Sequence, residues 1–123
     1  MNGNSIVLDT TIILYLLNGD DKLALFLNKM KLFDSIISEI EWLACEEIAN
    51  DEKIKICNFL SECTIVILNL EIKNSCIASK QTIKNKAPDV IIATPALYFQ
   101  IPLITSDKGF ERIQNLDLSL DKN

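Results

Sequence analysis

Four carboxylates lie at or just inside the positions where the sequence predicts that helices begin: Asp9, Glu41, Asp89 and Asp107. Asp9 and Asp107 each follow an apolar run typical of a buried strand, residues 6–8 and 102–105. Parallel strands share one edge for their carboxyl ends, where ligands bind, so acids far apart in sequence can meet there. Carboxylates without a basic partner are held together by a hard divalent cation. The pattern therefore predicts a metal-dependent site.

Each of these acids also has a purely structural explanation. Asp9 and Asp107 could cap the helices that follow them, and Glu41 could complete a capping box with Ser38. Asp89 lies in what would be the first turn of a helix, where the helix dipole favours an acid. Asp89 also follows a helix and a loop, so the strand-end argument does not place it. The residues alone leave both explanations open.

The composition limits the chemistry. There is no histidine, which excludes Ser-His-Asp and Cys-His nucleophilic catalysis. The four cysteines form no C-x-x-C pair, so a structural zinc site is not expected. The net charge of -5 argues against a broad basic surface for nucleic acid. It is compatible with a nucleic-acid enzyme whose acidic pocket is neutralised by Mg²⁺ or Mn²⁺.

Strand and helix patterns alternate along the chain and predict one α/β domain, residues 1–123, with a mainly parallel central sheet. No apolar run is long enough to cross a bilayer and residues 1–5 do not resemble a signal peptide, so we expect a cytoplasmic protein. Strands are predicted at 5–8, 33–37, 64–68 and 103–105, with 117–120 as a candidate edge strand. Helices are predicted at 10–18, 22–31, 38–49, 70–84, 90–98 and 108–113. Another helix is predicted to begin at residue 51, with Ile54, Cys57 and Leu60 on its inward face.

The chain resembles PIN-domain proteins, and specifically the VapC-type toxins of bacterial toxin–antitoxin pairs. The matching segments cover nearly the whole chain in order and spacing: residues 6–13 (IVLDTTII), 35–41 (SIISEIE), 88–94 (PDVIIAT) and 102–110 (PLITSDKGF). The resemblance implies a PIN-like three-layer fold and a metal-dependent endoribonuclease. It also implies the site residues: Asp9, Glu41, Asp89 and Asp107 as catalytic acids and ligands of Mg²⁺ (or Mn²⁺), with Thr105 supplying a hydroxyl.

The resemblance further implies an RNA substrate, a second copy of the chain in a homodimer, and a cognate antitoxin that covers a groove and blocks the site. Residues 12–17 are apolar on every side, so their helix must be fully buried or covered by a partner. Positive groups must hold RNA, and five lie near the acids, although each also suits an ordinary solvated surface. They are Lys80, Lys84, Lys86, Lys108 and Arg112.

Three positions depart from the family pattern: Thr11 stands where asparagine is usual, Gly109 where an acid is frequent, and Pro95 inside the late helix, which it should kink. They leave open a PIN-like binding module with weak or no catalysis. A more remote alternative is a receiver-type phosphoacceptor domain. That alternative lacks its central aspartate, because the strand at 64–68 ends at Asn69.

Overall fold

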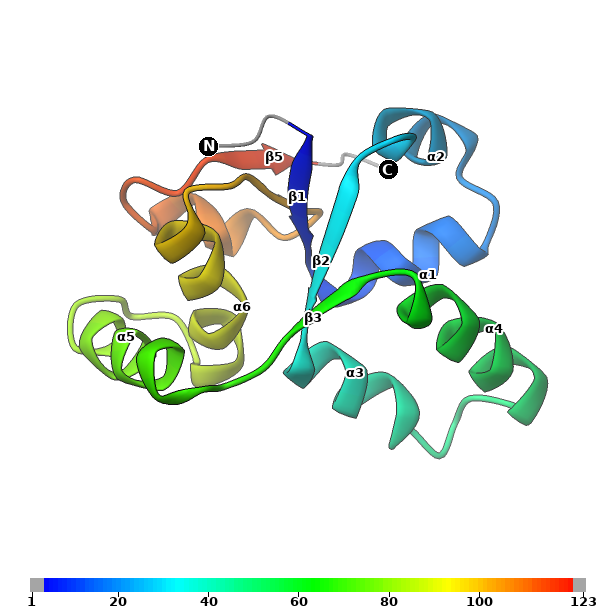
Figure 1. Cartoon of the computed structure of the whole chain (residues 1–123), viewed down its shortest axis with the longest axis horizontal. Coiled ribbons are helices and arrows are strands. Elements are labelled where there is room, and N and C mark those ends of the chain that lie inside the picture. The colour runs from blue at the N-terminus through cyan, green and yellow to red at the C-terminus, as the bar shows by residue number, and fades with distance from the viewer. Residues whose placement is uncertain (1–3, 121–123) are drawn as a thin grey trace.

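The computed structural model describes residues 4–120 and contains a five-stranded, fully parallel sheet (Figure 1). The α/β fold with a mainly parallel sheet is therefore confirmed. The strand order, β3-β2-β1-β4-β5, differs from the 2-1-3-4-5 order of receiver domains, so the receiver alternative is wrong. The strands are β1 (Ser5–Leu8), β2 (Lys31–Ser35), β3 (Thr64–Val66), β4 (Leu103–Thr105) and β5 (Leu118–Leu120).

Helices cover both faces of the sheet and make a three-layer structure. They are α1 (Thr10–Leu17), α2 (Asp21–Leu27), α3 (Ile36–Leu43), α4 (Asn50–Ser61), α5 (Leu70–Lys80), α6 (Ala87–Phe99) and the 3-10 helix η1 (Lys108–Arg112). Figure 1 shows α1, α2 and α4 on one side of the sheet and α5 and α6 on the other. None of the helices in residues 4–120 combines the length and apolar character needed to cross a bilayer.

The core lies in two clusters, one on each face of the sheet. Ile6 and Leu8 pack with α1, α2 and α4, whereas Val7 packs with α6 and with Phe110 of η1. Successive side chains of a strand point to opposite faces, so β1 is buried on both sides. This explains its uninterrupted apolar sequence.

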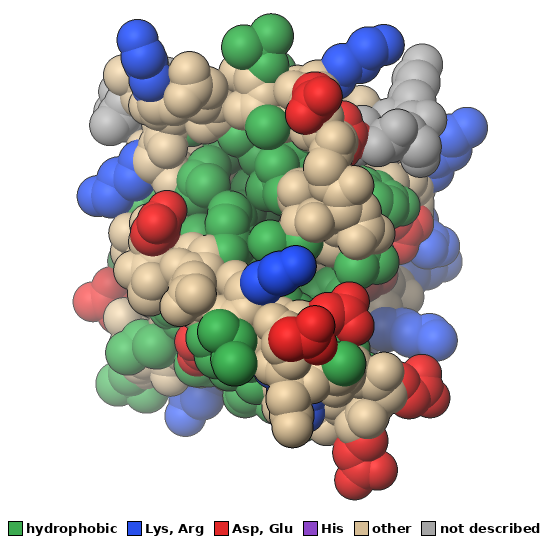
Figure 2. Space-filling model, turned by 90° about the vertical axis from the view of Figure 1, so that its right-hand side faces the viewer, with side chains coloured by type: hydrophobic (Ala, Val, Ile, Leu, Met, Phe, Trp, Pro, Cys, Tyr) green, Lys and Arg blue, Asp and Glu red, His purple; other side chains and the backbone are tan. Residues whose placement is uncertain are grey.

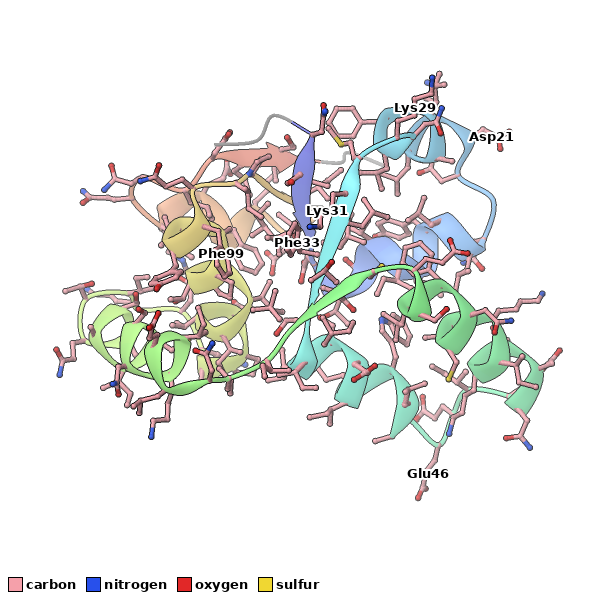
Figure 3. All side chains as sticks on the ribbon, in the orientation of Figure 1. Asp21, Lys29, Lys31, Phe33, Glu46 and Phe99 are labelled. Carbon is pink, nitrogen blue, oxygen red and sulfur yellow. The ribbon has the colours of Figure 1, made fainter. Side chains whose placement is uncertain are left out.

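Aromatic side chains join β2 to α6. The rings of Phe33 and Phe99 stack with centroids 6.4 Å apart, and the Lys31 ammonium lies 5.4 Å from the Phe33 ring centroid (Figure 3). Phe99 also meets Tyr98 edge-on. These contacts fix the C-terminal end of α6, whereas Asp89 lies in its first turn.

Several predicted boundaries are wrong for local reasons. The helix predicted at 22–31 ends at Leu27, because Lys29 has a positive φ of 68° and Lys31 pairs with Ser5 in the sheet. The next strand therefore spans Lys31–Ser35 instead of 33–37. Helix α3 begins at Ile36 with the side chain of Ser35 as its cap, so the capping box that was to start at Ser38 is also wrong.

The remaining differences concern the middle and the end of the chain. Leu60 of α4 is buried as predicted, but Ile54 and Cys57 are exposed and Ile56 is buried instead. The strand expected at 64–68 stops at Val66 and lies at the edge of the sheet, so it is not buried. The helix expected at 38–49 ends at Leu43, and the one expected at 70–84 ends at Lys80. Helix α6 continues past Pro95 as one element.

Candidate active site

The candidate site begins where β1 and β4 lie side by side. The chain crosses to opposite faces after these two strands, and in open α/β sheets such a switch point leaves a crevice for ligands. Asp9 follows β1, and its backbone N–H donates to the carbonyl of Ile104 over 3.0 Å. Thr105, the last residue of β4, donates from Oγ1 to Asp9 Oδ2 over 2.5 Å. The structure therefore brings Asp9 and Thr105 together.

The environment of Asp9 disfavours its charged form. Burial raises the pKa of the Asp9 carboxyl, and the negative charges of Asp89 and Asp107 raise it further. The hydrogen bonds from Thr105 and from the Thr10 backbone N–H, at 2.7 Å, oppose this rise in pKa. Two of the other predicted acids, Asp89 and Asp107, therefore act electrostatically on Asp9.

Asp107 is held by the turn between β4 and η1. Its backbone N–H donates to Thr105 Oγ1 over 3.0 Å, and its Oδ1 accepts from the Gly109 N–H over 2.8 Å. A Cβ added at Gly109 would lie 3.0 Å from Asp107 Oδ1. Asp107 is therefore also a cap for η1, as its structural explanation predicted, and Asp9 likewise caps α1.

Asp89 is placed by a residue that the sequence did not single out. Asn85 is only 2% exposed, and its Nδ2 donates to Asp89 Oδ2 over 3.4 Å and to the Gly109 carbonyl over 3.1 Å. Two acceptors for one amide nitrogen fix the orientation of the Asn85 side chain. Asn85 therefore ties the start of α6 to the turn that carries Asp107.

Glu41 joins the site less directly. It is exposed on α3, and its Oε1 accepts from Thr10 Oγ1 over 3.3 Å. Thr10 Oγ1 also lies 2.7 Å from Ser38 Oγ, and its backbone carbonyl accepts from Trp42 Nε1 over 3.0 Å. The charges that raise the pKa of Asp9 include those of Asp89 and Asp107; Glu41 is connected to Asp9 through its neighbour Thr10.

Thr11, which stands where the family usually has asparagine, has a hydrogen-bond partner in Ser106. Thr11 Oγ1 lies 3.3 Å from Ser106 Oγ, and Tyr15 Oη lies 3.3 Å from the same atom. Ser106 sits between Thr105 and Asp107. Thr11 and Tyr15 therefore tie α1 to the turn after β4.

A second buried acid lies deeper in the sheet and was not predicted as notable. Asp34 of β2 is 0% exposed, and neither carboxylate oxygen has a hydrogen-bond partner. Burial, with smaller contributions from the charges of Glu39 and Asp9, raises its pKa to about 7; the nearby Ser35 N–H and Ser38 hydroxyl lower it but lack normal hydrogen-bond geometry. The sequence gives no sign that Asp34 is buried, because an acid on a half-exposed strand would have the same neighbours in the sequence.

The donor set suits a hard divalent cation. The four acids and Thr105 offer only oxygen atoms, and Mg²⁺ typically binds one or two carboxylates and keeps several waters. Among residues 4–120, no three acid or thiol side chains lie close enough together to enclose an ion. Like charges repel, and each acid instead accepts a hydrogen bond from a neutral group nearby. The residues fit an ion held largely through water.

A family model for the PIN domain matches residues 6–116. The match covers most of the chain, and the chain belongs to the PIN-domain family. The family resemblance inferred from the sequence is thereby confirmed.

Several solved toxin–antitoxin complexes have a similar fold. A complex from Klebsiella pneumoniae has a TM-score of 0.77 and 23% identity, covering 93% of this chain and 95% of the other. VapBC2 from Rickettsia felis, bound to a promoter DNA fragment, has a TM-score of 0.78 and 21% identity, covering 94% and 98%. VapBC-1 from nontypeable Haemophilus influenzae has a TM-score of 0.77 and 26% identity, covering 94% and 97%. A search of curated protein sequences found no match.

Proposed function

We propose that this protein is a metal-dependent endoribonuclease and the toxin of a toxin–antitoxin pair. One observation carries the proposal: Thr105 holds the Asp9 carboxylate at the switch point, where burial raises the pKa of Asp9 and the charges of Asp89 and Asp107 raise it further. A cation would relieve this repulsion. Membership of the PIN-domain family and the toxin–antitoxin complexes among similar structures support the same function.

Asp9 and Asp89 would be the main ligands of Mg²⁺ or Mn²⁺, with Glu41 and Asp107 completing the site through water or a second ion. When bound, the ion supplies an activated water and neutralises charge on the phosphate. The chain itself orients the acids: Thr105 fixes Asp9, Asn85 fixes Asp89, and the Gly109 N–H fixes Asp107. Within residues 4–120, Glu41 accepts a hydrogen bond from Thr10 through Oε1 only, so Oε2 is available to accept a proton from a nearby water.

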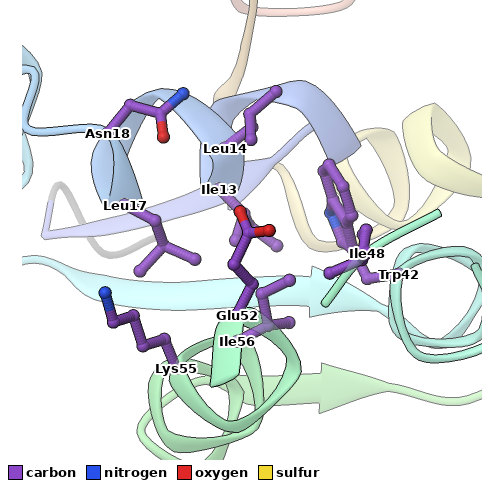
Figure 4. A pocket seen from close by; sticks show the side chains of 9 residues that line it. All are labelled: Ile13, Leu14, Leu17, Asn18, Trp42, Ile48, Glu52, Lys55 and Ile56. Atoms are coloured by element: carbon purple, nitrogen blue, oxygen red, sulfur yellow. The ribbon is translucent and has the colours of Figure 1, made fainter. Parts of the chain in front are cut away.

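A groove between α1 and α4 suits the antitoxin. Ile13 and Leu17 of α1 face Ile56 of α4 across it, and Trp42 and Ile48 close one end (Figure 4). Glu52 and Lys55 of α4 stand at its rim. Figure 2 views this side of the molecule and shows hydrophobic side chains gathered in a central hollow, with charged side chains around it. An amphipathic segment of a cognate antitoxin would cover this apolar surface.

A second copy of the chain would cover the other apolar surface. Ile77 of α5 is 54% exposed and Leu68 is 44% exposed, and both line a cavity of about 250 Å³ between α5 and α6 that also contacts Ile91. We propose that this surface forms the homodimer. Light scattering should give a dimer mass for the parent protein and a monomer mass for Ile77→Glu.

Cleavage of RNA tests the proposed activity. Purified protein free of antitoxin would be incubated with a small-RNA pool, with Mg²⁺, with Mn²⁺ and with EDTA. Discrete fragments should appear only with a metal ion, should be lost in Asp9→Asn, and should persist in Asp117→Asn, which removes a carboxylate from an exposed position. Intact RNA from a folded protein that still binds Mn²⁺ would favour the alternative of an inactive PIN-like binding module.

A further inference from the structure

A polar cavity of about 510 Å³ lies beside the candidate site, bounded by the end of α5, by α6 and by the segment after η1. Its volume is within the range of roughly 300–1,000 Å³ that is typical of small-molecule sites. Two cations line it, Lys84 and Arg112, together with neutral hydrogen-bonding side chains that include Ser79, Thr82, Asn85 and Asn115. None of the lining residues in the described part of the chain is an acid.

This lining is unusual for such a chain. The protein has 17 acidic and 12 basic residues, so an arbitrary part of its surface would carry excess negative charge. Here two positive side chains and several neutral donors converge without an acid between them. Charge-assisted hydrogen bonds from such groups favour an anion with several oxygens, and a phosphate is the simplest.

The cavity shares a wall with the candidate site. Asn85 lines the cavity and donates to Asp89 Oδ2 and to the Gly109 carbonyl. Arg112 Nε donates to the same Gly109 carbonyl over 3.1 Å. The other guanidinium nitrogens of Arg112 have no hydrogen-bond partner within residues 4–120, so they are available to a ligand.

The cavity extends along α6. Leu97 lines it and lies about two turns along α6 from Asp89. The space therefore starts beside the acids and continues away from them along the helix. A polymer strand that ran along α6 from the acids would enter this space.

We propose that this cavity is a subsite for the RNA strand, in which Lys84 and Arg112 hold the phosphate of a nucleotide that flanks the scissile bond. The assignment rests on the nuclease function proposed above. It separates these two residues from the other positive side chains near the acids, because Lys80, Lys86 and Lys108 do not line the cavity.

The test measures binding, so that it does not depend on cleavage. All variants would be made in the Asp9→Asn background and titrated with a fluorescein-labelled, 12-nucleotide single-stranded RNA of mixed sequence, in Mg²⁺ over a range of salt concentrations. Lys84→Gln with Arg112→Gln should weaken binding roughly tenfold or more. It should also reduce the slope of log K against log salt by about 0.7, the contribution of one neutralised phosphate on a single strand.

A matched double variant controls for net charge. Lys22→Gln with Lys29→Gln removes two exposed lysines from α2 and from the turn after it, on the opposite side of the sheet (Figure 1), and should leave affinity and salt slope nearly unchanged. Arg112→Lys keeps the charge but loses the Nε bond to Gly109, and should retain most of the binding. Thermal melts by circular dichroism would check that every variant is folded.

Equal losses of affinity in the two double variants would overturn the subsite, and so would an absence of RNA binding by the Asp9→Asn parent. The nuclease proposal fails separately, when protein with native Asp9 leaves RNA intact. If the protein does not cleave RNA but binds it in a way that depends on Lys84 and Arg112, the subsite proposal stands and the nuclease proposal fails.

Discussion

Replacing Asp34 with asparagine should stabilise the protein at neutral pH and change its stability little in acid. Asp34 is 0% exposed, and its two oxygens have no hydrogen-bond partner. Burial raises the pKa of its carboxyl from 3.8 to about 7. Folding at neutral pH therefore requires either burying a charge or taking up a proton.

Proton linkage sets the direction and the size of the effect of Asp34→Asn on stability. The pKa of Asp34 is higher in the folded protein than in the unfolded chain, so protonation of Asp34 favours folding. This contribution to the free energy of unfolding is fully present below about pH 3.8 and is lost as the pH rises through about 7. Three pH units at about 1.4 kcal/mol each set an upper limit of about 4 kcal/mol. Asparagine has no charge, so the advantage of Asp34→Asn over the parent should grow by up to about 1.4 kcal/mol per unit between pH 4 and 7 and then level off.

Urea unfolding, followed by the fluorescence of the single tryptophan, Trp42, measures this between pH 5 and 8. Trp42 packs against the core cluster of α1 and α4, so its emission should report global unfolding. Asp117→Asn, at an exposed position, removes the same charge and serves as the control. If the parent and Asp34→Asn stability curves stay parallel over this range, the carboxyl does not take up a proton on folding and the reasoning is refuted.

Three further predictions concern the acids and the core. Mn²⁺ should raise the melting temperature of the parent protein, because it neutralises clustered carboxylates, and should have no effect on Asp9→Asn; an equal shift in both would place the ion elsewhere. Thr105→Val removes a hydrogen bond that lowers the pKa of Asp9, so the acid limb of the cleavage–pH profile should move to higher pH; an unchanged limb would contradict this. Phe110→Ala should destabilise the fold by about 3–5 kcal/mol in urea unfolding, because the ring is 1% exposed and its removal leaves a cavity; a loss below about 1 kcal/mol would show that the core closes around it.

The fold was predictable where one short-range pattern dominated. The apolar run of β1 and the helix that ends before Gly19, with its φ of 90°, have no competing interpretation. In α4 the pattern was ambiguous, because Leu60 has helical spacing from Ile56 as well as from Cys57. The contact with β3 and α1 decides between the two faces, and this contact is not visible in the sequence. The boundary at Leu27 was missed because sheet pairing overrides a helical pattern that continues to Met30.

The site was predictable only in part. Strand ends identified Asp9 and Asp107, and these lie together because β1 pairs with β4. Asp89 follows a loop, so only the resemblance to PIN-domain proteins placed it, and its role as a metal ligand stays a prediction. Asn85 had no signal at all, since a polar residue in a Lys-rich loop is ordinary. Its role depends on burial against η1, which is a property of the tertiary structure.

The three departures from the family pattern leave the positions of the acids intact. Thr11 bonds Ser106 and so supports the turn between Thr105 and Asp107. The Gly109 N–H donates to Asp107 and its carbonyl accepts from Asn85, and a Cβ at this position would lie 3.0 Å from Asp107 Oδ1, so the Asp107 side chain would have to shift slightly. Pro95 lies well over a turn beyond Asp89, within a helix that continues past it. The contacts around these three positions therefore give no reason to expect displaced carboxylates.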